Sequence, residues 1–414
     1  TTILTGNNTA FTGTTVVNGG TLRAGGASAF ADNTRYEING GTLDLAGHDL
    51  TMALLWGTGG TLTSTGAEAD LVLDQDDVTG FSGDITGLRN ITKTGFGTVF
   101  LRGNTTVSGM IGVDEGIISF GGGKIITSGR GAITAAGTGD ADVEISGAGT
   151  RWTIGTDLKL GETGGSGRGN LWIWDKAVVS ANTLDVGNAS SARVTVSGAD
   201  GRLLVADAAT IGSGVGGQGL LVLSDRGVAE IDGGTGTLEL GTSSGSSGTL
   251  VFGAEEGSAP AGAGTLLADT VAFGAGTGRI VFNHANAAYD FAADVTGDGT
   301  LAFVNGETLL SGDYTGFTGS AEIYRTGAAR LQSNFTGNVG LHSGVVYTLD
   351  GTLAGRFTVN DGALLNGQGT IGGLSLASGG TLAPGNSIGT ITVAGDASFG
   401  PGSIYAVEVN GTGG

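Results

Sequence analysis

The chain offers few residues of the types that catalyse reactions, and its three histidines are the first of these. His48, His284 and His342 stand far apart in a sequence of 414 residues. Acid–base catalysis needs a histidine or carboxyl group held beside the reacting group. The surroundings of His284, FNHANAAYDF, are typical of a structural segment. We therefore expect structural or exposed roles for all three histidines.

Nucleophile and metal motifs are equally weak. The strings GTSSG (241–245) and GNSIG (385–389) match the G-x-S-x-G pattern, but that pattern needs a strand-to-helix turn and no helix is expected after either. Asp74, Asp76 and Asp77 form an acidic cluster. A Ca²⁺ site needs six to eight oxygen ligands, so a solvated loop is the simpler interpretation. We predict no catalytic residue, no metal site and no cofactor.

Two tryptophans are the best candidates for binding. Trp172 and Trp174 alternate with Leu171 and Ile173. Successive side chains of a strand point to opposite faces, so both indoles point outward if the aliphatic pair points inward. Outward aromatic side chains often mark a surface that binds protein or sugar. A second interpretation stays open, in which the loop 162–169 covers the indoles.

Composition restricts the elements that position these residues. The chain has 86 Gly, 3 Pro, no Cys and a net charge of −20. Each Gly inside a helix costs about 1 kcal/mol relative to Ala, so a helical domain is disfavoured. The absence of Cys excludes a disulfide scaffold. A strongly negative surface repels the phosphates of nucleic acid, so we expect no nucleic-acid partner.

A short repeat predicts a stacked array of strands. The string GGTL begins at residues 19, 40 and 59 and returns at 379. Between such glycines, apolar and polar residues alternate, as in the segments 143–145 and 391–393. A self-similar period near 20 with short strands and tight corners is typical of a solenoid. We predict an all-β, right-handed parallel β-helix, or β-solenoid, in the form of a single elongated rod.

A longer repeat, close to 50 residues, occupies the middle of the chain. The string VEISGA (143–148) matches VTVSGA (194–199), and Trp152 aligns with Leu203, which places this indole in the core. Each unit corresponds to two long turns. We divide the rod into turns with short repeats (1–142), two units of about 50 residues (143–256), further turns (257–350) and a C-terminal cap (351–414).

Several of these segments resemble a known family. The run LTGNNTAFTGTTV (4–16) and a second copy, LSGDYTGFTG (310–319), resemble the passenger-associated repeat of autotransporter proteins. The segment 364–409, with LNGQGTIGG and GGTLAPGNSIGTITV, resembles the autochaperone region that precedes the translocator. The resemblance covers most of the chain. It implies the passenger of a monomeric type V autotransporter, without its translocator barrel.

The resemblance also implies a folding role for the C-terminal segment. In that family this region folds first outside the cell and serves as a template for the turns before it. Growth from a formed edge is easier than a new start, because each turn closes only a short loop. We expect five apolar residues to form the stacked interior of this segment: Leu374, Leu376, Leu382, Ile391 and Val393.

The expected function is adhesion at the bacterial cell surface, on the extracellular face of the outer membrane or after secretion. The expected partner is a protein or glycan of the host cell surface or extracellular matrix, contacted through Trp172 and Trp174. Contact with the outer membrane would occur only through a translocator that this chain lacks. Two alternatives stay open: self-association, and a stalk that presents an N-terminal head.

Overall fold

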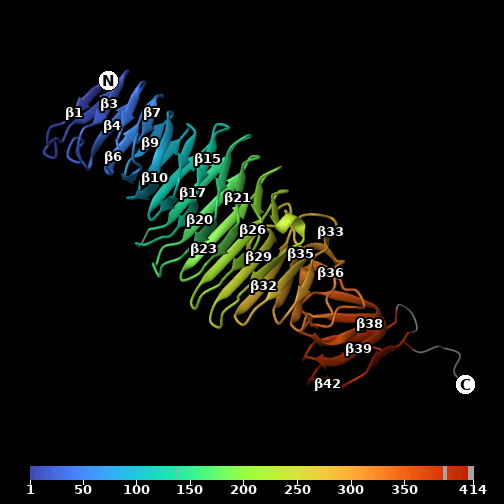
Figure 1. Ribbon diagram of the computed structural model, residues 1–414. Helices are drawn as coiled ribbons and strands as arrows, with labels where there is room; N and C mark the ends of the chain where they lie inside the picture. The colour runs from blue at the N-terminus through green and yellow to red at the C-terminus, as the bar shows by residue number, and fades with distance from the viewer. Residues whose placement is uncertain (138, 386–388, 409–414) are drawn as a thin grey trace, which may run out of the picture.

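The protein is a long parallel β-solenoid in the form of an elongated rod (Figure 1). The computed structural model describes residues 1–414 except 138, 386–388 and 409–414. Most turns contribute short strands to three faces, the third of which begins at β9, and strands of one face pair in parallel from turn to turn. The described residues contain no α-helix, and the 3₁₀ turn η1 (Asp232–Gly234) is their one helical element.

The strands of each face follow one another along the rod. The first face contains β1 (Thr2–Leu4), β3 (Thr21–Ala24), β5 (Thr42–Asp44), β7 (Thr61–Thr63), the start of β10 (Asp84–Thr94), β12 (Thr105–Val107), β15 (Ile125–Ser128), β18 (Arg151–Ile154), β21 (Val178–Ala181), β24 (Arg202–Val205), β27 (Val228–Ile231), β30 (Thr265–Leu267) and β33 (Tyr289–Phe291). The second face contains β2 (Thr14–Val17), β4 (Thr34–Ile38), β6 (Leu50–Trp56), β8 (Ala69–Asp74), the end of β10, β13 (Met110–Val113), β16 (Arg130–Ile133), β19 (Asp157–Leu160), β22 (Thr183–Val186), β25 (Ala209–Ile211), β28 (Thr237–Leu240), β31 (Thr270–Phe273) and β34 (Asp294–Thr296).

The third face carries the candidate site. It contains β9 (Val78–Phe81), β11 (Thr98–Leu101), β14 (Gly116–Phe120), β17 (Ala141–Ser146), β20 (Gly169–Trp174), β23 (Ser191–Val196), β26 (Gln218–Leu223), β29 (Ser247–Gly253), β32 (Thr277–Asn283), β35 (Thr300–Leu310), β36 (Ser320–Arg330) and β37 (Asn338–Leu341). The last turns are built from β38 (Val346–Val359), β39 (Leu364–Leu376), β40 (Thr381–Pro384), β41 (Ile391–Val393), β42 (Ala397–Phe399) and β43 (Ile404–Tyr405).

Both sequence repeats have a direct structural meaning. Leu22, Leu43 and Leu62 of the GGTL strings are register partners in consecutive turns. In the longer repeat, Val143 and Val194 both pair with Leu171, so equivalent residues lie two turns apart. The predicted parallel β-solenoid is thus confirmed, because the repeat length equals the number of residues in one turn or in two.

One apolar core runs along the inside of the rod. Inward positions alternate with outward ones, and the inward side chains are almost completely buried. Trp152 is 0% exposed, which confirms its predicted place in the interior, and its Nε1 donates to the Ser128 hydroxyl (3.0 Å). Farther along, Phe252, Phe282 and Phe303 stack in consecutive turns, with ring centroids 5.4 and 5.0 Å apart.

Candidate functional site

Trp172 and Trp174 lie on the outer side of β20, as the alternation predicts. Their neighbours Leu171 and Ile173 are completely buried inside the solenoid. The two indoles are half-buried, and their ring centroids are 6.2 Å apart with an interplanar angle of 37°. They therefore form one compact aromatic pair whose orientation is fixed by the strand beneath.

Arg193 joins this pair to the next turns. It lies on the outer side of β23, and its guanidinium stands over the Trp172 ring, 5.0 Å from the centroid. Its Nε donates to the Thr195 hydroxyl (2.9 Å), and its Nη1 forms an ion pair with Glu255. A guanidinium over an indole is attracted to the ring quadrupole, so Arg193 holds the indole in place while covering part of it.

The partner of Arg193 belongs to a long corner loop, residues 254–264. This loop follows β29 and folds back over the outer side of the third face. Asn283 anchors it, because its Nδ2 donates to the carbonyls of Glu255 (3.0 Å) and Ser258 (3.1 Å). Arg279 adds a second ion pair, from Nη2 to the Glu256 carboxylate at 2.9 and 3.1 Å.

A glycine permits the loop to leave the strand at this angle. Gly253 has φ of 94°, and a Cβ at this position would stand 2.2 Å from the carbonyl oxygen of Asn283. Any other residue would have a strained backbone conformation there, and its Cβ would clash with the next turn. The Gly at the end of β29 is therefore required by the close approach of the next turn.

Under and beside the loop lies a second apolar cluster, outside the core. Val222, Val251, Val281 and Ala302 are register partners on consecutive turns, and none is more than 4% exposed. We name these four residues the outer column. Sequence reasoning missed it. The signal was present as uninterrupted apolar runs, such as LLVL (220–223), since strands buried on both sides lose their alternation.

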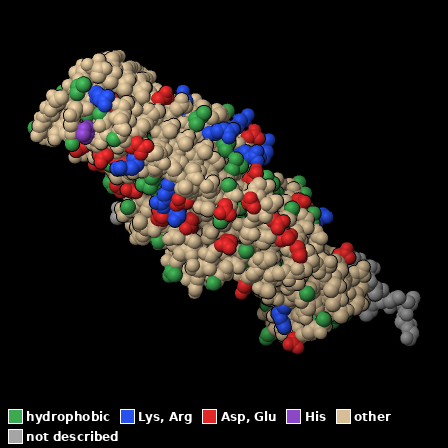
Figure 2. All heavy atoms as spheres, viewed as in Figure 1, with side chains coloured by type: hydrophobic (Ala, Val, Ile, Leu, Met, Phe, Trp, Pro, Cys, Tyr) green, Lys and Arg blue, Asp and Glu red, His purple; other side chains and the backbone are tan. Residues whose placement is uncertain are grey.

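A polar cleft of about 310 Å³ opens between the loop and the starts of these strands. Its floor is apolar and includes Val251 and Val281 of the outer column. Its walls carry side chains that can form hydrogen bonds: Arg168, Ser191, Gln218, Ser247, Thr249, Glu255, Glu256 and Arg279. Figure 2 shows acidic and basic side chains interspersed along the rod, without a large patch of one sign on the face in view.

The alternative cover for the indoles, loop 162–169, lies mainly against the preceding turn. A Cβ on Gly165 would stand 1.9 Å from the carbonyl oxygen of Ala135, and one on Gly167 would stand 2.0 Å from that of Gly139. Its Glu162 pairs with Arg130 on β16 of the second face. The residue that stands over the Trp172 ring is Arg193 of β23, which does not belong to this loop.

The histidines and the serine motifs remain apart from the cleft. His284 is completely buried, its Nε2 lies 3.0 Å from the Thr308 hydroxyl, and burial lowers its pKa. His342 pairs with Glu322 (2.8 Å) and stacks on Tyr324, whereas His48 is half-buried near the N-terminus. The motif at 241–245 forms a tight corner that leads into β29. The motif at 385–389 lies partly outside the described residues.

The acidic cluster serves local hydrogen bonding. Asp74 Oδ1 accepts from the Thr94 hydroxyl (3.0 Å), and Asp76 Oδ1 accepts from the Phe96 amide (2.9 Å). Within the described ranges, no group of three or more histidine, cysteine or acidic side chains could hold a metal ion. In the same ranges, no helix is long and apolar enough to cross a membrane.

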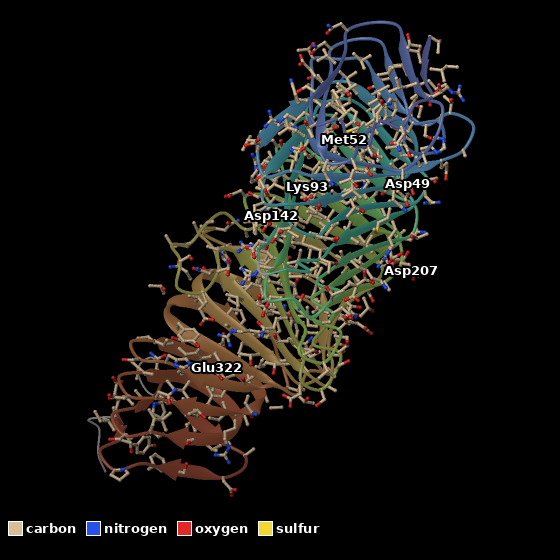
Figure 3. The ribbon with its side chains drawn as sticks, turned by 90° about the vertical axis from the view of Figure 1, so that its left-hand side faces the viewer. Asp49, Met52, Lys93, Asp142, Asp207 and Glu322 are labelled. Atoms are coloured by element: carbon tan, nitrogen blue, oxygen red, sulfur yellow. The ribbon has the colours of Figure 1, made fainter. Side chains whose placement is uncertain are left out.

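A buried lysine lies beside this cluster. Lys93 points into the solenoid and is 0% exposed (Figure 3). Its ammonium donates to the carbonyls of Gln75, Thr94 and Gly95. Burial lowers the pKa of Lys93 to about 8, although Asp76, Asp74 and Glu115 oppose the shift. Four turns separate this group from the β23 turn, and it contacts none of the cleft residues.

The C-terminal residues occupy two environments. Leu374, Leu376 and Leu382 are buried in the core. Ile391 and Val393, on β41, are half-buried and pack against that core from the last turn. They are less buried because few strands follow β41 to cover them.

Three curated proteins are similar to parts of this chain, whereas no family model and no solved structure matches it significantly. An uncharacterized protein of Escherichia coli, YuaQ, is 27% identical over 216 residues, or 51% of this chain and 15% of YuaQ. The Adhesin BmaC autotransporter of Brucella suis is 30% identical over 199 residues, or 43% of this chain and 6% of BmaC. YdeK, an uncharacterized lipoprotein of E. coli, is 33% identical over 150 residues, or 35% of this chain and 11% of YdeK.

These matches cover small parts of much longer proteins. The chain spans no more than 15% of the length of any of the three relatives. One relative is by name an autotransporter adhesin, and a long parallel β-solenoid is the architecture that the sequence resemblance implies for a passenger. The chain is thus a distant relative of an autotransporter adhesin, with a fold that fits the passenger of such a protein.

Proposed function

We propose that this chain is a surface-exposed part of an autotransporter passenger and acts as an adhesin. The similarity to BmaC supports the class, and the location follows from it: the extracellular face of the outer membrane, or the medium after release. The observation that carries adhesion is the outward Trp172 and Trp174 pair beside a polar cleft, on a rod whose other large aromatic side chains are mostly buried.

The mechanism is non-covalent. A rigid rod presents the indoles, Arg193 and the loop 254–264 in a fixed arrangement, so binding orders few groups and loses little conformational entropy. Many rods on one cell bind together, and their weak contacts add up through multivalency. The receptor is a protein or glycan of the host cell surface or matrix. The net charge of −20 disfavours nucleic acid as a partner.

We propose further that residues 364–409 serve as the folding template of the rod. Leu374, Leu376 and Leu382 supply a buried stack on which the preceding turn closes. Ile391 and Val393 extend that stack toward the chain end. In a solenoid each turn contacts mainly its neighbours, so an edge that forms early lowers the barrier for the next turn.

A bead assay tests adhesion. Beads coated with the chain are incubated with host-cell monolayers, and attachment to cells and clumping of beads are scored together. A Trp172→Ser/Trp174→Ser double variant is compared with Trp56→Ser, because Trp56 is also half-buried but lies on β6. We expect attachment that the double variant loses and the Trp56 variant keeps.

Other outcomes identify the alternatives. Clumping without attachment would show a self-association module, in which the partner is a second copy of the chain. If the beads neither clump nor attach, this region is a stalk that presents another part of the protein. In both cases the adhesin proposal would be wrong for these residues.

A further inference from the structure

We propose that the outer side of β20 to β32 binds a neutral oligosaccharide, stacked on Trp172 and Trp174 and hydrogen-bonded in the cleft beside loop 254–264. This inference rests on the proposed adhesin function and names the chemistry of its receptor. Two features of the molecule carry it independently, an aromatic platform and a cleft whose polar groups are of the kind that hydroxyl groups require.

The aromatic platform is partly exposed and rigid. One face of many sugar rings consists of C–H groups, which pack well against the face of an indole. Trp172 and Trp174 both project from the outer side of β20, and Arg193 holds one face of the first indole, which leaves the other face of Trp172 and the Trp174 ring for a ligand. A platform that is ordered before binding loses little entropy when a ligand arrives.

The cleft supplies groups that both donate and accept. Sugar hydroxyls do both, and so do the Gln218 amide and the hydroxyls of Ser191, Ser247 and Thr249. Arg168 adds a guanidinium at the same wall, and no ion pair of its side chain occurs among the described residues. The volume of about 310 Å³ is at the lower end of the range for ligand pockets. It suits a short segment of a glycan chain.

Local charge selects a neutral glycan over a polyanionic one. Three arginines surround the site, but Arg193 and Arg279 already pair with Glu255 and Glu256. Glu144 is the register partner of Trp172 in the preceding turn and adds a third carboxylate, so three arginines at the site face three carboxylates. A sulfated or carboxylated chain needs a net positive surface. The balance here offers bidentate hydrogen bonding without attraction for a polyanion.

The two features follow one another along the rod axis, in neighbouring columns of the third face: Trp172 aligns with Val281, and Arg193 aligns with Arg279. Trp172 is on β20, and Arg279 is on β32, four turns farther along. With a strand spacing of 4.7–4.9 Å, the site extends for about 19 Å. Arg193 and Glu255 connect its ends. A linear oligosaccharide of a few rings can thus stack at one end and hydrogen-bond at the other.

The experiment uses the full chain and defined glycans. A microarray carries neutral oligosaccharides of glucose, galactose, mannose and N-acetylhexosamines, together with sulfated and carboxylated chains. Bound neutral glycans are then titrated in solution by tryptophan fluorescence. The variants are Trp172→Ala for the platform, Gln218→Ala for the cleft and Trp56→Ala as the matched control, each checked by circular dichroism and thermal unfolding.

We expect neutral glycans to bind with little dependence on salt. Trp172→Ala should weaken binding at least tenfold, Gln218→Ala several-fold, and Trp56→Ala should leave it unchanged. The proposal is overturned if no neutral glycan binds, if only acidic chains bind, or if the Trp172 and Gln218 variants bind as the original chain does.

The two proposals fail in distinguishable ways. If no glycan of either kind binds but Trp172 and Trp174 are still needed for beads to attach to cells, the receptor is a protein and adhesion stands; if only acidic chains bind, adhesion stands with an acidic receptor. If the chain binds neither glycans nor cells, both proposals are wrong.

Discussion

The two sides of the third face bury apolar side chains by different means. On the inner side, Phe252, Phe282 and Phe303 stack within the closed solenoid. On the outer side of the same strands, the outer column, including Val251 and Val281, is equally buried. The inner stack is covered by the other faces of every turn. The outer column depends on additional groups, among them one loop and its three polar anchors.

The difference shows which side has been adapted to a task. Closure of the rod needs the inner stack, whereas a solenoid turn closes without a loop over its outer side. Most corners from the third face to the first are much shorter, such as residues 224–227 after β26. The long corner 254–264 is therefore an added feature, and it also forms one wall of the cleft. Buried apolar side chains thus mark the core on the inner side and a loop-covered surface on the outer side.

The largest expected effect comes from the inner stack. Phe282→Ala should lower the free energy of unfolding by about 3–5 kcal/mol, because the cavity lies between two stacked rings and cannot collapse. Val251→Ala on the outer column should cost about 1.5 kcal/mol, the transfer term for two methyl groups. Urea unfolding followed by circular dichroism measures both. Equal losses would show that the outer column is as essential to the fold as the core.

The sequence predicts the inner side far better than the outer one. Leu22, Leu43 and Leu62 were expected to recur because a period near 20 in a β-rich chain has few structural solutions, and they are register partners. Outward placement of Trp172 and Trp174 followed from simple alternation. The outer column was missed because an apolar run such as LLVL does not show which part of the protein covers its outer side.

The anchors of the loop were beyond sequence reasoning for a geometric reason. Arg193 and Glu255 are 62 residues apart, and they meet because the loop folds back across two turns. Nothing in the local pattern of either residue encodes that direction. Repeats predict which residues stack, since stacking is periodic, but an insertion interrupts the period and its path is set by contacts far away in the chain.

The next effect in size concerns the anchor of the loop. Asn283→Ala should lower the free energy of unfolding by about 1–2 kcal/mol. The Asn283 side chain is buried, so the carbonyls of Glu255 and Ser258 lose a hydrogen-bond donor that water does not readily replace. Limited proteolysis should then cut within 254–260 much faster. Asn182→Ala is the control, since Asn182 is exposed although it donates to the Gly155 carbonyl. Unchanged proteolysis would mean that the ion pairs alone hold the loop.

A third prediction concerns Lys93, a charged residue on the otherwise apolar inner side near the N-terminal end. Its pKa is lowered to about 8, against 10.5 in the unfolded chain. Between these values the unfolded chain holds a proton that the folded chain has lost, so stability should rise with pH through this window. Thermal unfolding from pH 7.5 to 9.5 measures the rise, and Lys93→Met should abolish it.

The window has an upper limit set by other groups. Burial raises the pKa of Tyr289 and of Tyr314. Above about pH 10 the unfolded chain loses these protons first, so stability should fall as pH rises further. A Lys124→Met variant is the control for the loss of one positive charge. If that control and Lys93→Met have the same slope below pH 9.5, the buried ammonium is not the cause.

The smallest expected effect belongs to the ion pair at the far end of the loop, and it separates binding from stability most sharply. Arg279→Gln should cost about 0.2–1 kcal/mol, since both partners are partly exposed, and the difference should shrink in 1 M salt. A double-mutant cycle with Glu256→Gln isolates the pair. The same substitution removes a guanidinium from the cleft wall, so glycan binding should fall more than stability does. An equal fall in both would mean that this end of the cleft exists only to close the loop over the outer column.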